Sequence, residues 1–166
     1  CEFYFWLDDA WGAKEKGQNR EEAIRHIRSG KMRGYLAYVD GAVAGWINAG
    51  DRLGYERLCA TPGFLESGEY RIPGDPASGE AGRGKAVVCY LIRPEMRNRG
   101  IATALLERVV NDAASEGYAY VEAYPFNGAT TCAGNYHGPA ALYAKAGFTR
   151  VLSFPEMDVW RKFFDP

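Results

Sequence analysis

Apolar residues recur along the chain with two alternating periods, one typical of helices and one typical of strands. Near the N-terminus, Asn19 followed by Glu22 predicts a capping box that starts a helix over EEAIRHIRS, with Gly30 as its end. Two strand-like runs follow, GYLAYV and AVAGWINA, and the Asp40-Gly41 pair between them predicts a hairpin. The first part of the chain is therefore expected to form a helix and a hairpin.

The middle of the chain predicts a strand, a helix and a second strand. KAVVCYLI is typical of a buried strand and ends before Pro94. A helix over Arg99–Glu116 follows from helical spacing of its apolar residues, and Gly117 ends it. YAYVEAY is the next strand and ends at Pro125. The apolar positions of the helix are Ala102, Leu105, Leu106, Val109, Val110 and Ala113.

The remaining segments predict a long loop, a short helix and two final strands. Thr61–Gly84 is rich in Gly and Pro, which predicts a loop. Pro139 starts and Gly147 ends the helix PAALYAKA, and the runs TRVLSF and MDVWRKF are strand-like. Strand, helix and strand in succession imply a parallel pair with a right-handed crossover. We therefore predict an α/β domain (an α+β mixed sheet) with antiparallel outer strands and helices on both faces.

Composition narrows the class of protein further. The chain has 166 residues, which suits one domain, and 20 basic residues stand against 21 acidic ones. This balance predicts no nucleic-acid or membrane partner. The four cysteines follow no metal-binding spacing, so we expect no metal site, and Cys89 is interpreted as a small core residue. Because no secretory segment is visible, a reducing cytoplasm is the expected location.

The stretch Ile92–Thr103 carries the candidate chemistry, because it leaves a buried strand and enters an amphipathic helix. The first turn of a helix presents N–H groups without intrahelical partners and the positive end of the helix dipole. Gly100 lets a ligand approach this backbone closely, and Arg97 and Arg99 add positive charge. Together these features predict a binding site for a pyrophosphate.

Several nucleotide-binding patterns use the same physics. A P-loop is not matched, and of the dinucleotide pattern G-x-G-x-x-G only Gly100 is present, although Glu122 stands near the expected place of a ribose-binding acid. Arg97-x-x-Gly100-x-Ala102 instead fits (Gln/Arg)-x-x-Gly-x-(Gly/Ala). A second block downstream, Ala-Ala-Leu-Tyr143-Ala-Lys-Ala-Gly-Phe148, fits a Leu/Phe-Tyr pair before (Glu/Ala)-Lys-x-Gly-Phe. In these two motifs the chain resembles the GNAT superfamily of N-acetyltransferases, from about Gly34 to Lys162.

The resemblance implies an acetyl-CoA-dependent enzyme whose central parallel strands splay apart around the pantetheine arm. Backbone groups of Leu91 and Ile92 are then expected to pair with that arm, and Tyr143 to lie near the thioester sulfur as a cofactor contact and general acid. An amine attacks the thioester carbonyl directly, and a strand-end N–H such as that of Ile92 stabilises the oxyanion. The pyrophosphate is expected on the amides of Arg97, Asn98, Arg99, Gly100, Ile101, Ala102 and Thr103.

The resemblance does not identify the general base. Glu122 is the first candidate, since it is a carboxylate on the strand beside the splay, and its alternative role is a paired structural acid or a recognition group for a cationic substrate. Asp51, for amine recognition, and His137, as a base, are further candidates, with a solvated acid and a structural loop histidine as their alternatives. Trp46, Tyr124, Tyr136 and Tyr143 are expected to line an acceptor pocket.

Two departures from the family pattern and three further expectations complete the prediction. Tyr136 stands where many relatives carry Asn, with Asn135 one step earlier. The chain is expected to be a single domain, residues 1–166, that either lacks the family's first strand or replaces it with CEFYFW. The acceptor is expected to be a small-molecule or peptide amine. The aromatic tail Trp160-Phe163-Phe164 is expected to pack either inside the domain or against a second subunit in a homodimer. Two other functions stay open: a catalytically silent acyl-CoA sensor and a nucleotide-binding oxidoreductase.

Overall fold

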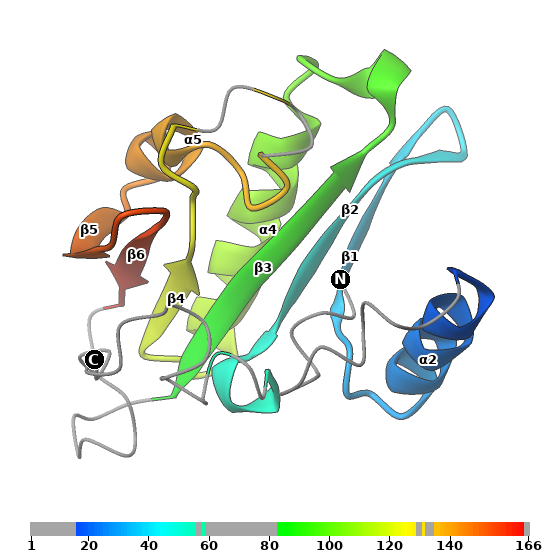
Figure 1. The fold of residues 1–166 in the computed structure, drawn as a ribbon, viewed down its shortest axis with the longest axis horizontal. Coiled ribbons are helices and arrows are strands. Elements are labelled where there is room, and N and C mark those ends of the chain that lie inside the picture. Colours follow the sequence, from blue (N-terminus) through cyan, green and yellow to red (C-terminus); the bar gives the residue numbers. More distant parts are fainter. Residues whose placement is uncertain (1–15, 56–57, 59–82, 129–130, 132–134, 165–166) are drawn as a thin grey trace.

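The computed structural model describes residues 16–55, 58, 83–128, 131 and 135–164, which form one six-stranded sheet with helices on its faces (Figure 1). The strands lie in the order β1-β2-β3-β4-β6-β5. They are β1 (Gly34–Val39), β2 (Ala42–Asp51), β3 (Gly84–Ile92), β4 (Tyr120–Ala123), β5 (Thr149–Ser153) and β6 (Asp158–Phe163). All six fall on the predicted strand segments, and the mixed-sheet fold class is confirmed.

Strand pairing follows the predicted topology. β1 and β2 form an antiparallel hairpin around Asp40 and Gly41, both with positive φ. β3 pairs with β4 in parallel, and the other neighbouring strands pair in antiparallel fashion. The parallel pair is short, because its register runs only from Gly84↔Tyr120 to Val87↔Ala123 while β3 continues to Ile92. The two central strands are therefore no longer paired beyond Val87, as the splayed arrangement requires.

A bulge in β3 accompanies the end of this pairing. Asn48 pairs with Cys89 and Ala49 with Val87, so Val88 is an extra residue on β3. A bulge bends its strand and increases the local twist, and bulges recur beside active sites. We infer that the bend at Val88 turns the end of β3 away from β4. Cys89 itself is buried in the core beside it, which confirms its predicted structural role.

The described helices are α2 (Lys16–Arg28), α4 (Ile101–Ser115) and α5 (Ala140–Lys145), with short 3-10 turns η2 (Arg52–Gly54) and η4 (Pro94–Met96). The capping box predicted at Asn19 is wrong, since α2 already includes Lys16 and Asn19 lies inside it. Polar residues three positions apart, such as Asn19 and Glu22, also occur within helices, so this pattern did not locate the start of α2. The predicted loop Thr61–Gly84 lies almost entirely outside the described residues. The segment CEFYFW (residues 1–6), the predicted alternative to a missing first strand of the family, also lies outside them.

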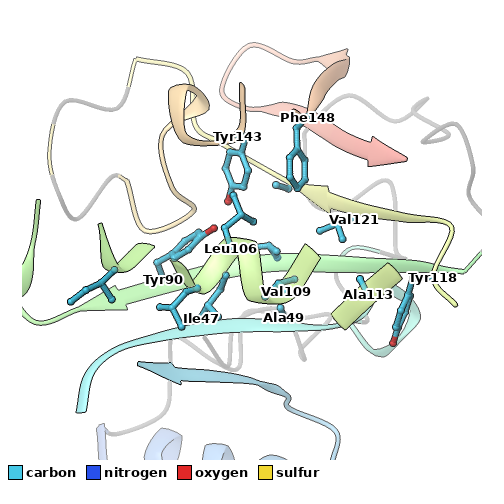
Figure 2. Close-up of a cluster of buried hydrophobic side chains, with 14 of the residues drawn as sticks. Ile47, Ala49, Tyr90, Leu106, Val109, Ala113, Tyr118, Val121, Tyr143 and Phe148 are labelled. Atoms are coloured by element: carbon cyan, nitrogen blue, oxygen red, sulfur yellow. The ribbon is translucent and has the colours of Figure 1, made fainter. Parts of the chain in front are cut away.

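Two apolar cores lie on opposite faces of the sheet. On one face, α4 packs its buried side chains Leu106, Val109 and Ala113 against Ile47 and Ala49 of β2 (Figure 2). α5 and the segment after it add Tyr143 and Phe148 to the same cluster. On the other face, Ala23 of α2 packs against a second cluster. Helices therefore cover both faces, as predicted. The second cluster contains Met32, Tyr55, Leu58, Ala86, Val88, Cys89, Tyr124, Phe154, Met157 and Val159.

Candidate active site

A cavity of about 480 Å³ opens where β3 ends, α4 begins and the segment before α5 crosses. This volume falls in the range of small-molecule sites. The cavity lies at the end of β3 that has separated from β4, which is where the sequence predicted a cofactor site. Its lining consists of Tyr90, Leu91, Ile92, Arg97, Ala102, Asn135, Tyr136, Gly138, Pro139 and Leu142.

The start of α4 has the geometry of an anion-binding turn. Gly100 precedes the helix with φ +79°, and a Cβ placed on it meets nothing within 4 Å. Asn98 also has a positive φ, so the backbone turns sharply between η4 and α4. Ala102 lines the cavity, while Ile101 turns inward and packs in the core. The first-turn amides of α4 therefore lie beside the cavity with open space above Gly100.

The two predicted arginines differ in position. Arg97 is exposed, lines the cavity and donates from Nε to the carbonyl oxygen of Ile92 at 3.4 Å. Arg99 is also exposed, and its Nη1 lies 3.0 Å from the sulfur of Met96. Arg97 and Arg99 both come shortly before Ile101, the first residue of α4, where the helix dipole also attracts an anion. Arg97 is the one that faces the cavity.

We expect Gly100→Ala to weaken coenzyme A binding about tenfold or more, because the added methyl group enters the open space beside the first turn of α4, where the pyrophosphate is proposed to bind. The left-handed backbone alone costs about 1–2 kcal/mol of folding free energy. Gly117→Ala is the matched control, since Gly117 ends the same helix with φ +75° and equally open space. Calorimetric titration with coenzyme A measures the effect. Equal losses of affinity in both variants would contradict a role of Gly100 in binding.

The free edge of β3 directs backbone donors toward the separated side. The Tyr90 N–H points away from β2 and donates to the carbonyl oxygen of Tyr136 at 2.6 Å. Two residues further, the Ile92 amide has the same direction, since backbone groups alternate along a strand. The adjacent Arg93 N–H instead donates to Ala44 of β2. The orientation of Ile92 is thus the one required of the predicted oxyanion donor, while Tyr90 is the nearer backbone link to the segment 135–139.

Tyr143 lies deeper than the sequence suggested. Its side chain is fully buried, it does not line the cavity, and its hydroxyl donates to the carbonyl oxygen of His137. Burial and the neighbouring Tyr90 hold the pKa of Tyr143 well above its usual value, so the phenol keeps its proton. Tyr90 and Tyr143 point toward one another (Figure 2), and Gly138 packs against both rings. Tyr143 thus lies one layer behind the cavity wall.

His137 is fully buried against aromatic rings. Its ring centroid lies 4.3 Å from that of Tyr136 and 4.6 Å from that of Phe126. Burial lowers the pKa of His137 to about 3, so the imidazole is neutral at physiological pH. A group with that pKa is a weak proton acceptor, and the geometry favours the structural interpretation of His137.

The buried His137 should make the protein acid-labile. Its pKa is about 3 in the folded chain against an ordinary histidine value of 6.5, so below pH 6.5 the unfolded chain takes up a proton that the folded chain does not. The free energy of unfolding should therefore fall by about 1.4 kcal/mol per pH unit as pH decreases below 6.5. Urea unfolding between pH 7.5 and 4.5 measures this slope, and His137→Gln should flatten it. A slope unchanged by that substitution would contradict the assignment.

Glu122 lies in a buried ion cluster. Its two carboxylate oxygens accept from Arg52 Nε at 2.9 Å and from Arg161 Nε, and the Tyr124 hydroxyl donates to the first of them. All three charged side chains are at most 2% exposed. In the sheet register Glu122 lies opposite Ala86, four residues and about 13 Å before the first β3 residue that lines the cavity. This arrangement favours the structural alternative over the general base.

Asp51 lies at the far end of the sheet from the cavity. It pairs with Lys85 in register, seven residues and about 23 Å along β3 from Ile92. Its carboxylate accepts from Arg83 Nε at 2.7 Å and from the Leu53 N–H. The structure thus gives Asp51 an ion pair and a turn cap, and does not bring it to the candidate site.

The structure brings together part of the predicted set. Leu91, Ile92, Arg97 and Ala102 line one cavity. The neighbouring residues Asn98, Arg99, Gly100 and Thr103 are exposed and are not part of its lining. Of the predicted acceptor-pocket aromatics, only Tyr136 lines it. The cavity residues that the sequence analysis did not single out for the site are Tyr90, Gly138, Pro139 and Leu142. The Gly138-Pro139 pair just before α5 was the sequence feature that could have indicated this side of the cavity.

A family model described as the acetyltransferase (GNAT) family matches residues 2–148. This match spans most of the chain. The chain belongs to the GNAT acetyltransferase family. Its membership agrees with the separated parallel strands and the glycine-led start of α4, which are the features that the resemblance implied. No curated protein matches the sequence.

Solved structures agree with the family in their fold. An N-acetyltransferase from Staphylococcus aureus Mu50 is 16% identical with a TM-score of 0.56, over 90% of this chain and 78% of that one. A ribosomal-protein-alanine N-acetyltransferase from Brucella melitensis is 16% identical with a TM-score of 0.55, over 89% and 78%. An aminoglycoside 6'-acetyltransferase type Ii is 16% identical with a TM-score of 0.56, over 90% and 80%. At these identities the likeness establishes the GNAT fold.

Two features are absent from residues 16–55, 58, 83–128, 131 and 135–164. None of the helices there has the length and apolar character that a bilayer crossing demands. In the same ranges, no three His, Cys, Asp or Glu side chains gather as a metal-binding group.

Proposed function

We propose that this GNAT acetyltransferase moves an acetyl group from acetyl-CoA to a primary amine of a small molecule or peptide. The observation that carries the proposal is the cavity at the separated end of β3, bounded by the glycine-led start of α4. A phosphate-bearing, elongated cosubstrate fits this combination, because the amides and Arg97 attract the pyrophosphate while the free edge of β3 offers backbone groups to the arm. The family of the chain supports acyl transfer.

The proposed reaction is a direct attack. The amine nitrogen attacks the thioester carbonyl carbon, the C–N bond forms, and the oxyanion accepts a hydrogen bond from a β3 amide. As the C–S bond breaks, the thiolate takes a proton from the Tyr143 hydroxyl, which must then turn away from the His137 carbonyl oxygen. Among the described residues that line the cavity, none is a carboxylate or an imidazole. We therefore assign removal of the proton from the amine to water.

The test is release of free thiol when purified protein is mixed with acetyl-CoA and a library of amines. Turnover of at least one amine, with acetylation of its nitrogen confirmed by mass, is expected. Binding of coenzyme A without transfer to any amine would favour a silent acyl-CoA sensor, a second candidate to which the buried Tyr143 and the ion-paired Glu122 give some support. Stabilisation by NAD but not by coenzyme A in a thermal-shift assay would favour an oxidoreductase instead.

The cellular setting follows from the same proposal. We place the enzyme in the cytoplasm, where acetyl-CoA is available and a buried thiol such as that of Cys89 stays reduced. Nucleic acid and membrane are not expected as partners, given a formal net charge of −1. The homodimer stays a prediction, supported by Phe163, which is exposed at the end of β6.

A further inference from the structure

A row of apolar side chains crosses three strands beside the cavity. Leu36 of β1 pairs with Trp46 of β2, and Trp46 pairs with Leu91 of β3. Side chains directly opposite one another on neighbouring strands lie on the same face. We call Leu36, Trp46 and Leu91 the apolar ladder. At about 4.8 Å per strand, it spans about 10 Å of the sheet.

The apolar ladder is open to solvent. Leu36 is 48% exposed and Leu91 is 67% exposed, while Trp46 is half-buried and packs against the second core. Tyr38, next on the same face of β1, is 60% exposed. Single exposed apolar side chains are common on proteins, whereas contiguous exposed apolar patches mark interaction or ligand-binding sites. The exposure is confined to the end of the face where the cavity lies, because Asn48 and Cys89, further along β2 and β3, are buried.

The ladder is continuous with the candidate active site. Leu91 belongs to both, since it lines the cavity as well as the ladder. On the opposite face at the same level, α4 covers β2: Ile92 and Ile101 pack against the core, and a Cβ on Gly45 would lie 2.6 Å from the former and 3.1 Å from the latter. An acceptor that reaches the separated end of β3 therefore has the ladder face, and not the α4 face, as its open approach.

We infer that the apolar ladder binds the non-reacting part of the acceptor, so that the enzyme selects amines carrying an aliphatic or aromatic group of about four to eight carbons. The inference rests on the proposed function and names the substrate class of the same site. The longest of these groups cover the roughly 10 Å between β1 and β3, the shortest cover the single strand spacing from Leu91 to Trp46, and in both cases the amine reaches over Leu91 toward the cavity. Removing its apolar surface from water supplies the binding energy.

The test compares two series of primary amines, n-propylamine to n-octylamine and the amino alcohols of equal chain length, with 2-phenylethylamine added. We expect kcat/KM to rise about two- to fourfold per CH2 in the alkylamine series, mostly through KM, and to stay lower for each amino alcohol. Leu36→Asp should flatten this rise at its long end and lower kcat/KM for n-octylamine about tenfold, with coenzyme A affinity unchanged. Leu53→Asp is the control, because Leu53 is 57% exposed but lies beyond the far end of β2.

Each other outcome overturns the inference in a distinct way. No preference of the wild-type enzyme for n-hexylamine over 6-amino-1-hexanol, or equal effects of the two Asp variants, would show that the ladder does not bind the acceptor. A change in oligomeric state of Leu36→Asp in size-exclusion chromatography, with unchanged KM, would show that a second copy of the chain covers it. If no amine of any kind led to release of free thiol from acetyl-CoA, that result would instead contradict the proposed function itself.

Discussion

Glu122→Gln is expected to lower the free energy of unfolding by about 3–5 kcal/mol, because it leaves two buried guanidinium groups without a counter-charge. Arg52 and Arg161 are at most 2% exposed, and both bond Glu122 through Nε. The Arg161 guanidinium also stacks on Tyr120, with its carbon 4.5 Å from the ring centroid, so it cannot swing to solvent without losing that contact. Urea unfolding at pH 7 measures the loss.

Asp51→Asn is the matched control for the loss of an ion pair. Asp51 pairs with Arg83 through side chains that are 35% and 53% exposed, so its removal should cost at most about 1 kcal/mol. The same two variants decide the role of Glu122 in catalysis. If Glu122→Gln kept its stability but lost about 10²-fold or more in kcat, the carboxylate would be the general base after all, and the structural interpretation would be refuted.

Tyr143→Phe is expected to reduce turnover about 10²-fold, since it removes the proton donor proposed for the departing thiolate. The structure adds a condition to this prediction, because the Tyr143 hydroxyl donates to the His137 carbonyl oxygen in the free protein. The hydroxyl must exchange that acceptor for the sulfur during the reaction. Single-turnover thiol release with a saturating amine isolates the chemical step from binding.

Tyr55→Phe is the control, since it also removes a buried hydroxyl that makes a hydrogen bond. Tyr55 is 1% exposed and donates to Asn48 Oδ1 at 2.8 Å, on the opposite face of the sheet from Tyr143. Its loss should reduce stability by about 1–3 kcal/mol and leave the single-turnover rate unchanged. Equal rates in the two variants would remove Tyr143 from the role of general acid and leave it as a structural link between α5 and His137.

The sequence by itself determined the strands, the topology and the cofactor-side turn. Alternation and turn residues located the β1–β2 hairpin, and helical spacing with a flanking glycine located α4 at Ile101–Ser115, within two residues of its predicted ends. These features are local: each depends on residues close together in the chain, so backbone preference and burial act on a pattern that can be seen in the sequence. The same locality made Arg97, Gly100 and Ala102 predictable as a group.

Only the tertiary structure decided which of the chemically active residues meet. Glu122 and Asp51 were plausible from their places on strands, yet partners distant in sequence, Arg161 and Arg83, pair with them. The bulge at Val88 arises from register between strands, and the open ladder face from what packs on each side of the sheet. Such contacts join residues far apart in the chain, and their energies depend on burial and on the charges nearby. No local pattern encodes these contacts. The residue type limits the interactions that a side chain can make, and the surrounding fold decides which of those interactions it makes.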